Sequence, residues 1–192
     1  MSNILIVGAG KGIGLETARL LVDENLLTIS RNVTPELTSL ETAFFELDVA
    51  KDDLNQISLP DELHGLVFCP GSINLRPFNR LSENDFLADF NQNFMGAIRI
   101  VQKCLPALKK SKSASIVLFS TVAVKLGMPF HTSIAASKGA IEGFAKSLAA
   151  ELATANIRVN VIAPSLSDTS LAAQLLSTEE KRVASAKRHP LQ

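Results

Sequence analysis

Residues 4–14 read ILIVGAGKGIG, a short apolar run that passes directly into a glycine-rich turn. The next residues, LETARLLV, have the apolar spacing of an amphipathic helix. A strand, a glycine turn and a helix in this order direct backbone N–H groups at a ligand from the positive end of the helix dipole. We therefore expect a phosphate-binding site formed by Gly8, Lys11, Gly12, Ile13 and Gly14, which is typical of nucleotide-binding proteins.

The glycine spacing, Gly-x-x-x-Gly-x-Gly, matches neither the common G-x-G-x-x-G fingerprint nor a P-loop. Gly8 is expected to form the tight turn after the strand, and Gly12 and Gly14 to let a pyrophosphate approach the backbone. A tight turn that binds nothing is the alternative interpretation. Four glycines within residues 8–14, at the first strand-to-helix turn, favour a nucleotide.

Short apolar runs alternate with segments of helical periodicity along the whole chain. The clearest helix begins at Ile134, after which apolar residues recur at helical intervals along one face. This alternation predicts an α/β fold of the Rossmann-like, doubly wound type, in which a parallel sheet lies between two layers of helices. We expect about six strands in the order 3-2-1-4-5-6, with ligands at their carboxyl ends. The predicted strands are residues 4–7, 26–30, 43–47, 65–69, 115–120 and 157–163.

The composition excludes several classes of function. The 192 residues are 46% hydrophobic, enough for a single domain over residues 1–192 without disulfides. Nineteen basic side chains balance nineteen acidic ones, which argues against nucleic acid or a membrane surface and favours a small-molecule ligand. Cys69 and Cys104 stand singly in apolar runs, so we expect reduced core thiols, no metal site and a cytoplasmic protein. The sequence has neither an apolar run of membrane-spanning length nor a basic leader.

The second predicted strand ends in Ser30-Arg31, where an NAD-binding protein usually offers an acid to the ribose hydroxyls. A carboxylate there would repel a 2′-phosphate, whereas Arg31 can form charge-assisted bonds to it, and Lys11 can reach the same group. Two solvated surface cations are the alternative. Because both stand at the expected positions, we predict that NADP(H) is preferred over NAD(H).

With these motifs the chain resembles the short-chain dehydrogenase/reductase family over essentially its whole length. The glycine turn matches the family's motif, and residues 138–164, KGAIEGFAKSLAAELATANIRVNVIAP, match its active-site helix and sixth strand. The resemblance implies an oxidoreductase that transfers hydride between NADP(H) and a small carbonyl or alcohol substrate. The further cofactor contacts that it implies are Asp48 and Val49 near the adenine, and Gly71, Lys138, Pro164 and Thr169.

Residues 131–138, HTSIAASK, occupy the segment that normally carries the family's catalytic Tyr-x-x-x-Lys, and Ile134 stands at the position of the tyrosine. The chain contains no tyrosine at all. The resemblance implies that Asn93, Lys138 and Thr121, which stands at the position of the family's serine, form the rest of the catalytic site. Ser120 is the alternative if the register slips by one residue.

A proton donor must replace the tyrosine if the protein is a reductase. His131 is the nearest titratable candidate, and a loop histidine that faces solvent is the alternative. A catalytically inactive NADP(H)-binding protein, acting as a sensor or assembly partner, is the alternative function.

The resemblance also implies a homo-oligomer, either a dimer or a tetramer, through helices at residues 91–109 and 134–152. Relatives continue beyond Gln192 with another helix and a final strand, so we expect a C-terminally truncated domain without that strand.

Overall fold

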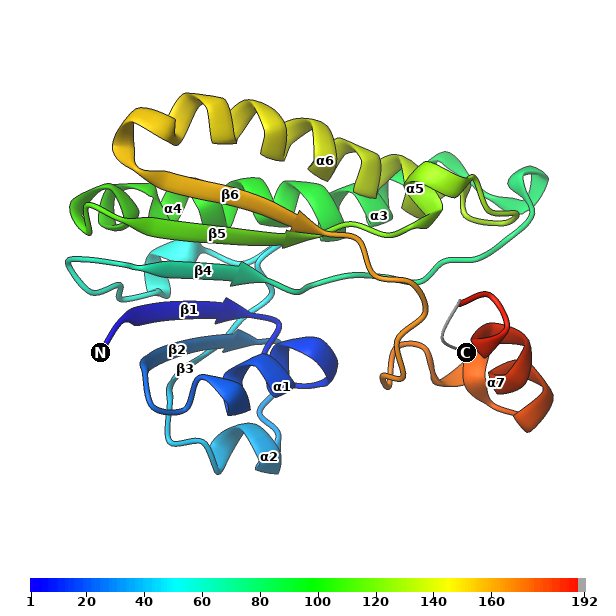
Figure 1. The fold of residues 1–192 in the computed structure, drawn as a ribbon, viewed down its shortest axis with the longest axis horizontal. Coiled ribbons are helices and arrows are strands. Elements are labelled where there is room, and N and C mark those ends of the chain that lie inside the picture. The colour runs from blue at the N-terminus through cyan, green and yellow to red at the C-terminus, as the bar shows by residue number, and fades with distance from the viewer. Residues whose placement is uncertain (190–192) are drawn as a thin grey trace.

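A computed structural model describes residues 1–189 of the chain. One parallel sheet runs through it, with the strands in the order β3-β2-β1-β4-β5-β6 (Figure 1). The predicted strand order is confirmed, and each strand begins and ends within one residue of its predicted range. The strands are β1 (Asn3–Val7), β2 (Asn25–Ser30), β3 (Ala43–Glu46), β4 (Gly65–Phe68), β5 (Ala114–Phe119) and β6 (Ile157–Ile162). Residues 1–189 contain no seventh strand, and β6 forms one edge of their sheet.

Helices cover both faces of the sheet, as the alternation of strands and helices predicts. The helices are α1 (Gly12–Leu20), α2 (Pro35–Thr38), α3 (Glu83–Phe90), α4 (Gly96–Lys110), α5 (Ala123–Leu126), α6 (Thr132–Leu152) and α7 (Glu179–Ala186). Alternate residues of β1 point to opposite faces, so Leu5 and Val7 pack into the larger core with α4 and α6, while Ile6 packs with α1 and α2. None of these helices combines the length and the apolar composition that crossing a bilayer requires.

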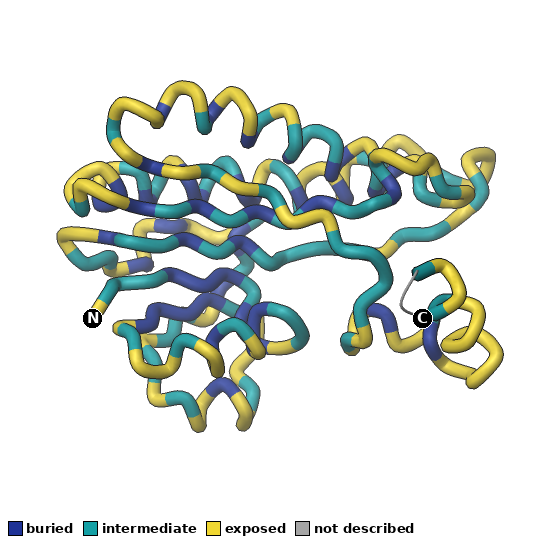
Figure 2. The backbone as a smooth tube through the Cα atoms, in the orientation of Figure 1, coloured by how far each residue is buried: buried dark blue, intermediate teal, exposed yellow. Residues whose placement is uncertain are grey.

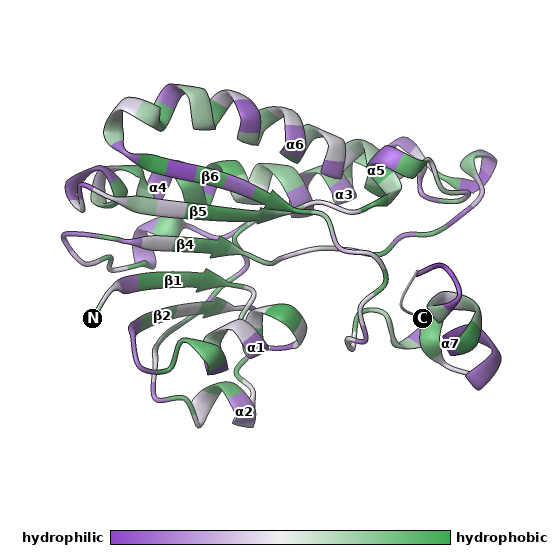
Figure 3. Ribbon diagram, in the orientation of Figure 1, coloured by the Kyte–Doolittle hydropathy of each residue, from purple (hydrophilic) through white to green (hydrophobic). Residues whose placement is uncertain are grey.

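Burial and hydropathy follow the same layers. The middle strands are largely buried, whereas the outer turns of the helices are exposed (Figure 2). Strand β1 is hydrophobic along most of its length, and α6 carries hydrophilic residues on its outer turns (Figure 3). Cys104 is fully buried, but Cys69, the residue that follows β4, is only partly buried. The prediction of two core thiols is therefore wrong for Cys69.

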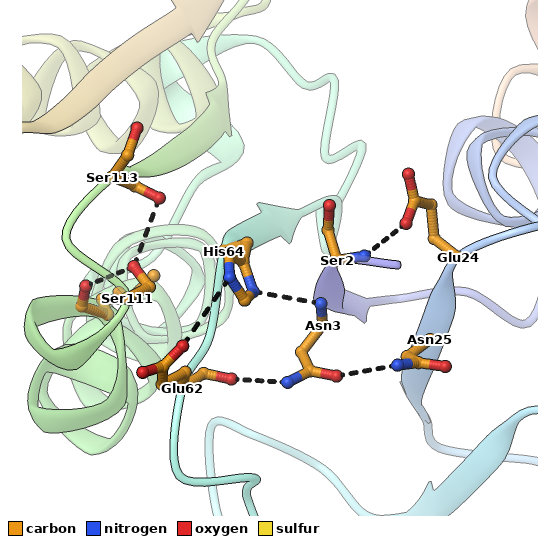
Figure 4. Close-up of polar contacts among 9 residues, drawn as sticks. Ser2, Asn3, Glu24, Asn25, Glu62, His64, Ser111 and Ser113 are labelled. Carbon is orange, nitrogen blue, oxygen red and sulfur yellow. Dashed lines mark hydrogen bonds and ion pairs between the residues drawn. The ribbon is translucent and has the colours of Figure 1, made fainter.

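The two ends of the sheet differ in how their polar groups are satisfied. At the amino end, Asn3 donates its backbone N–H to His64 Nδ1 at 3.2 Å and its side-chain amide to the Glu62 carbonyl at 2.8 Å (Figure 4). Asn25 donates to Asn3 Oδ1 at 3.2 Å. These contacts close the amino end with the chain's own groups. The strands all point the other way, toward α5 and α7, and the glycine turn follows β1 at that carboxyl end (Figure 1).

Candidate functional site

Two hollows meet at the carboxyl end of the sheet. The first is a groove of about 180 Å³ over the ends of β1, β2 and β4. Most of the predicted cofactor-binding residues line it, and only Lys138 and Pro164 lie in the neighbouring cavity instead. The predicted residues in the groove are Gly8, Lys11, Gly12, Ile13, Gly14, Arg31, Asp48, Val49, Gly71 and Thr169.

The glycine turn has a backbone that other residues rarely adopt. Gly8 has a φ of 81° and Gly12 a φ of 57°, both in the left-handed region where a side chain is strained. A Cβ at Gly14 would instead run into the carbonyl oxygen of Gly8, so Gly14 lets the helix pack against the turn. The structure thus gives Gly14 a packing reason for lacking a side chain, and its predicted contact with a pyrophosphate stays a prediction.

The first turn of α1 suits an anion. Its N-cap residue, Lys11, makes no capping hydrogen bond with its side chain, and the first turn contains no acidic residue. The free N–H groups and the helix dipole therefore favour a phosphate at this end. Lys11 and Arg31 are exposed beside it, and within residues 1–189 no carboxylate oxygen lies within 4.0 Å of either cation. Both charges can therefore meet a phosphate without first breaking an ion pair.

The far wall of the groove is held by an arginine that the sequence did not reveal. Asp48 Oδ1 accepts the backbone N–H of Ala50 at 3.0 Å, which fixes the turn after β3. Arg99 donates to the carbonyl of Val49 at 2.6 Å and also to the carbonyl of Asp52. Arg99 thereby fastens this turn to α4.

The second hollow is a cavity of about 780 Å³ lined mainly by apolar side chains. Its walls come from the loop after β4, the end of β5, α5, the start of α6, the segment after β6, and α7. The cavity and the groove share five residues, namely Ile13, Cys69, Gly71, Thr169 and Leu171. A long ligand can therefore lie in the groove with one end in the cavity.

Two hydroxyls at the end of β5 border the cavity. Ser120 is 4% exposed and donates to Glu142 Oε1 at 2.7 Å. Glu142 Oε2 also lies 3.2 Å from Lys125 Nζ, and the bond from Ser120, followed by Lys125, lowers the pKa of Glu142. Thr121 Oγ1 accepts the N–H of Ala123 at 3.3 Å, and within residues 1–189 its proton has no acceptor. Thr121, rather than Ser120, therefore has a proton available for a carbonyl oxygen.

Lys138 is a buried cation beside both hollows. Its Nζ lies 3.5 Å from the carbonyl oxygen of Pro70, and the side chain lines the cavity. Burial lowers the pKa of Lys138 from 10.5 to about 8, and the neighbouring Cys69 opposes that shift only in part. Burial also raises the pKa of Cys69 to about 12, so this thiol stays protonated near neutral pH.

His131 lines the cavity near its mouth. Its Nδ1 lies 2.7 Å from the Pro129 carbonyl, which can only accept, so Nδ1 carries the proton. Within residues 1–189, Nε2 makes no hydrogen bond, so it is the ring nitrogen of His131 that remains for a ligand in the cavity.

Asn93 lies away from both hollows in a one-turn π-helix, Asn91–Met95, between α3 and α4. It is fully buried, and its Nδ2 contacts Ser72 Oγ at 2.9 Å and the Asp89 carbonyl at 2.7 Å. Its Oδ1 accepts the backbone N–H of Ser72 at 3.3 Å. Asn93 therefore holds the loop after β4 in place, while Ser72 is the residue of this group that lines the cavity. No sequence motif pointed to Ser72 or Asp89.

A glycine turn before an uncapped helix, at the carboxyl end of a 3-2-1-4-5-6 sheet, defines the class of dinucleotide-binding Rossmann proteins. Within that class, residues 2–180 match the model of the short chain dehydrogenases. The chain belongs to this family of oxidoreductases, and the resemblance seen in the sequence is confirmed.

Curated relatives agree with this assignment. The chain is 31% identical over 205 aligned residues to 3-oxoacyl-(acyl-carrier-protein) reductase FabG of Thermotoga maritima. This alignment covers 97% of this chain and 82% of that protein. It is 34% identical over 181 residues to retinol dehydrogenase 8 of Bos taurus, covering 84% of this chain. The chain spans only 57% of the length of that retinol dehydrogenase.

Solved structures share the fold. ElxO with NADP bound superposes with a TM-score of 0.85 at 25% identity, over 98% of this chain and 84% of that one. A short-chain type dehydrogenase/reductase from Mycobacterium ulcerans gives a TM-score of 0.89 at 23% identity, over 99% of this chain and 76% of that one.

Proposed function

We propose that the protein is an NADP(H)-dependent oxidoreductase that interconverts an apolar carbonyl compound and its alcohol. The observation that carries this proposal is the junction of the two hollows at Ile13, Cys69, Gly71, Thr169 and Leu171. A dinucleotide held by its phosphates at the start of α1 needs such an opening to present its other end to a substrate. The bound cofactor would supply the hydride chemistry.

The groove's two cations support the choice of cofactor. Lys11 and Arg31 would pair with a 2′-phosphate, which NADPH carries and NADH lacks. The ElxO structure, which is similar to this chain, holds NADP. We expect NADPH to bind at least about tenfold more tightly than NADH, because charge-assisted bonds contribute about 1.5 to 3 kcal/mol each. Titration calorimetry tests this, and equal affinities would contradict it.

The cavity supports an apolar substrate. Its lining is mainly apolar, and the two relatives are by name a retinol dehydrogenase and a 3-oxoacyl reductase. Thr121 would hold the carbonyl oxygen with its free proton. Lys138 would bind the cofactor's ribose hydroxyls, as the family resemblance implies, and fix its position against the cavity.

Ile134 favours a second candidate function, an NADP(H)-binding protein without turnover. It lines the cavity and is 6% exposed at the position where the family has its tyrosine. We would measure NADPH oxidation and NADP⁺ reduction with a panel of apolar aldehydes, ketones and alcohols. Turnover above the protein-free rate supports the oxidoreductase, whereas tight NADPH binding without turnover supports the binding protein.

A homo-oligomer, dimer or tetramer, remains part of the proposal. Phe90, which directly precedes the predicted contact segment at residues 91–109, is 37% exposed, and Met95 within that segment is 36% exposed. Light scattering at high protein concentration tests this prediction, and a strictly monomeric species would contradict it.

A further inference from the structure

Asp89 is a buried carboxylate that the proposed reaction has not used. It lies in the last turn of α3 and is 4% exposed. Its Oδ1 accepts the Ser72 hydroxyl at 2.5 Å and its Oδ2 accepts the Ser133 hydroxyl at 2.5 Å. Within residues 1–189, no lysine, arginine or histidine nitrogen lies within 4.0 Å of it. The charge on Asp89 is therefore balanced by hydrogen bonds alone.

Ser72 connects this carboxylate to the cavity. It lines the cavity, whereas Asp89 and Ser133 are buried at 4% and 1% exposure. Ser72 Oγ donates to Asp89 and accepts from Asn93 Nδ2 at 2.9 Å. A hydroxyl has one proton and two lone pairs, so one lone pair of Ser72 remains for a ligand. Asn93 and Asp89 together hold the Ser72 hydroxyl in one orientation.

We propose that Ser72 and Asp89 form the proton relay that replaces the family's tyrosine, an inference that rests on the proposed oxidoreductase function. During oxidation, the O–H bond of the alcohol breaks and its proton passes to Ser72 Oγ, while the proton of Ser72 passes to Asp89 Oδ1. The carbinol C–H pair leaves as hydride for NADP⁺, and the C=O bond forms. Asp89 ends as the carboxylic acid and returns its proton through Ser72 to water in the cavity after the carbonyl product has left. Reduction runs through the same transfers in reverse.

A second serine–carboxylate pair at the cavity shows why Asp89 suits this role better. Ser120 donates to Glu142 at 2.7 Å, but Glu142 also pairs with Lys125 at 3.2 Å. A nearby cation stabilises the carboxylate form, so Glu142 gives up its charge reluctantly. Asp89 has no cationic partner among the described residues, and its two carboxylate oxygens accept the hydroxyls of Ser72 and Ser133.

The experiment uses the full chain and four variants, with kcat, KM, the NADPH dissociation constant and the melting temperature measured for each. Asp89→Asn and Ser72→Ala should each lower kcat at least about 100-fold, the lower end of general acid–base effects, with NADPH affinity unchanged. Ser72→Thr keeps the hydroxyl and should retain most of kcat. Ser133→Ala removes the other bond to the same carboxylate but keeps the bond between Ser72 and Asp89, so it should lower kcat clearly less than Asp89→Asn does.

The relay is rejected if Asp89→Asn and Ser72→Ala keep the parental kcat. It is also rejected if Ser133→Ala loses as much as Asp89→Asn, because Asp89 would then only tether α3 to α6. If Asp89→Asn does not fold, the contrast between Ser72→Ala and Ser72→Thr decides alone. A parent that binds NADPH but turns over no substrate rejects the oxidoreductase function and the relay together, whereas active variants reject only the relay.

Discussion

The groove and the cavity share residues and a sheet edge, yet they are built from different parts of the chain. The groove depends mainly on backbone: the left-handed Gly8 and Gly12 and the uncapped start of α1. The cavity depends on side chains, and Ile134 stands in it where the family has a tyrosine. A backbone site is lost when the turn is lost. A side-chain site can change its chemistry while the sheet and its nucleotide groove stay intact.

The charged side chains of the groove and of the cavity also differ, in their exposure to solvent. Lys11 and Arg31 in the groove are exposed to solvent. Lys138 in the cavity wall and Asp89 behind Ser72 are buried, which costs free energy because both side chains can carry a charge. Buried polar groups of this kind are typical of functional sites, which supports a chemical role for the cavity.

Placing the family's tyrosine at position 134 should have the largest effect on the difference between the groove and the cavity. Ile134 precedes Lys138 by one helical turn, so a phenol at 134 would lie on the same face of α6 as the amine. In the Asp89→Asn background, which lacks the proposed relay, Ile134→Tyr should raise kcat for an apolar ketone by about 100-fold or more. Steady-state kinetics with NADPH measures this gain.

Ile134→Phe is the matched control for that experiment. Phenylalanine adds the same ring to the buried position and the same overpacking cost of about 1 to 3 kcal/mol, but no hydroxyl. A gain that Phe reproduces would be a packing effect. No gain with Tyr in a folded variant would mean that the cavity does not hold the carbonyl near residue 134.

Replacing the buried Lys138 is expected to stabilise the protein rather than to weaken it. Below pH 8 the Lys138 amine is charged in both the folded and the unfolded chain, so its burial lowers the free energy of unfolding. Between pH 8 and 10.5 the folded chain loses the proton while the unfolded chain still keeps it, so this loss of stability becomes smaller. Lys138→Met should therefore raise the free energy of unfolding at pH 7 by roughly 3 kcal/mol, at about 1.36 kcal/mol per pKa unit. The gain should shrink as the pH approaches 10.5.

Urea unfolding at several pH values measures that difference. Lys146→Met, an exposed position on the same helix, is the control and should show no comparable gain. A gain for Lys138→Met that is equal at every pH would mean that side-chain packing, and not the buried charge, causes it. The variant should also bind NADPH more weakly, so the cavity would gain stability and lose its ligand.

Replacing Arg31 tests the groove without changing the cavity. Arg31→Ala should weaken NADPH binding by about 10- to 100-fold and leave NADH binding unchanged, because only NADPH carries the 2′-phosphate. Arg158→Ala removes an exposed arginine on β6 and should alter neither affinity. Equal losses for both cofactors would place Arg31 at a phosphate that they share, and the proposed cofactor preference would then rest on Lys11 alone.

The sequence was sufficient for the sheet and for most of the groove because both are encoded locally. Apolar runs bounded by polar residues mark the strands, and the glycine turn follows the first strand directly. The capping box at Ser82 and Asp85 is likewise a short-range pattern, and the structure contains it at the start of α3.

The missed features all depend on residues that are far apart in the chain. Asp89 meets Ser72 and Ser133 across 17 and 44 positions, and Arg99 reaches Val49 across 50. No periodicity or motif connects such pairs, since only the packing of α3, α4 and α6 brings them together. The sequence therefore indicated Thr121 and Lys138 through the family's motif, whereas the contact of Ser72 with Asp89 could be identified only from the fold.

Ser120 and Thr121 provide the smallest test, because adjacent hydroxyls at the end of β5 should behave differently. Ser120→Ala removes the bond to Glu142 and should lower the free energy of unfolding by about 1 kcal/mol, with kcat nearly unchanged. Thr121→Val keeps the shape of the side chain but loses the free proton, so it should lower kcat and leave stability nearly unchanged. Urea unfolding and steady-state kinetics on the two variants separate these effects. The reverse result would mean that Ser120 leaves Glu142 to hold the carbonyl when a substrate binds, and that the family's serine position lies one residue earlier in this chain.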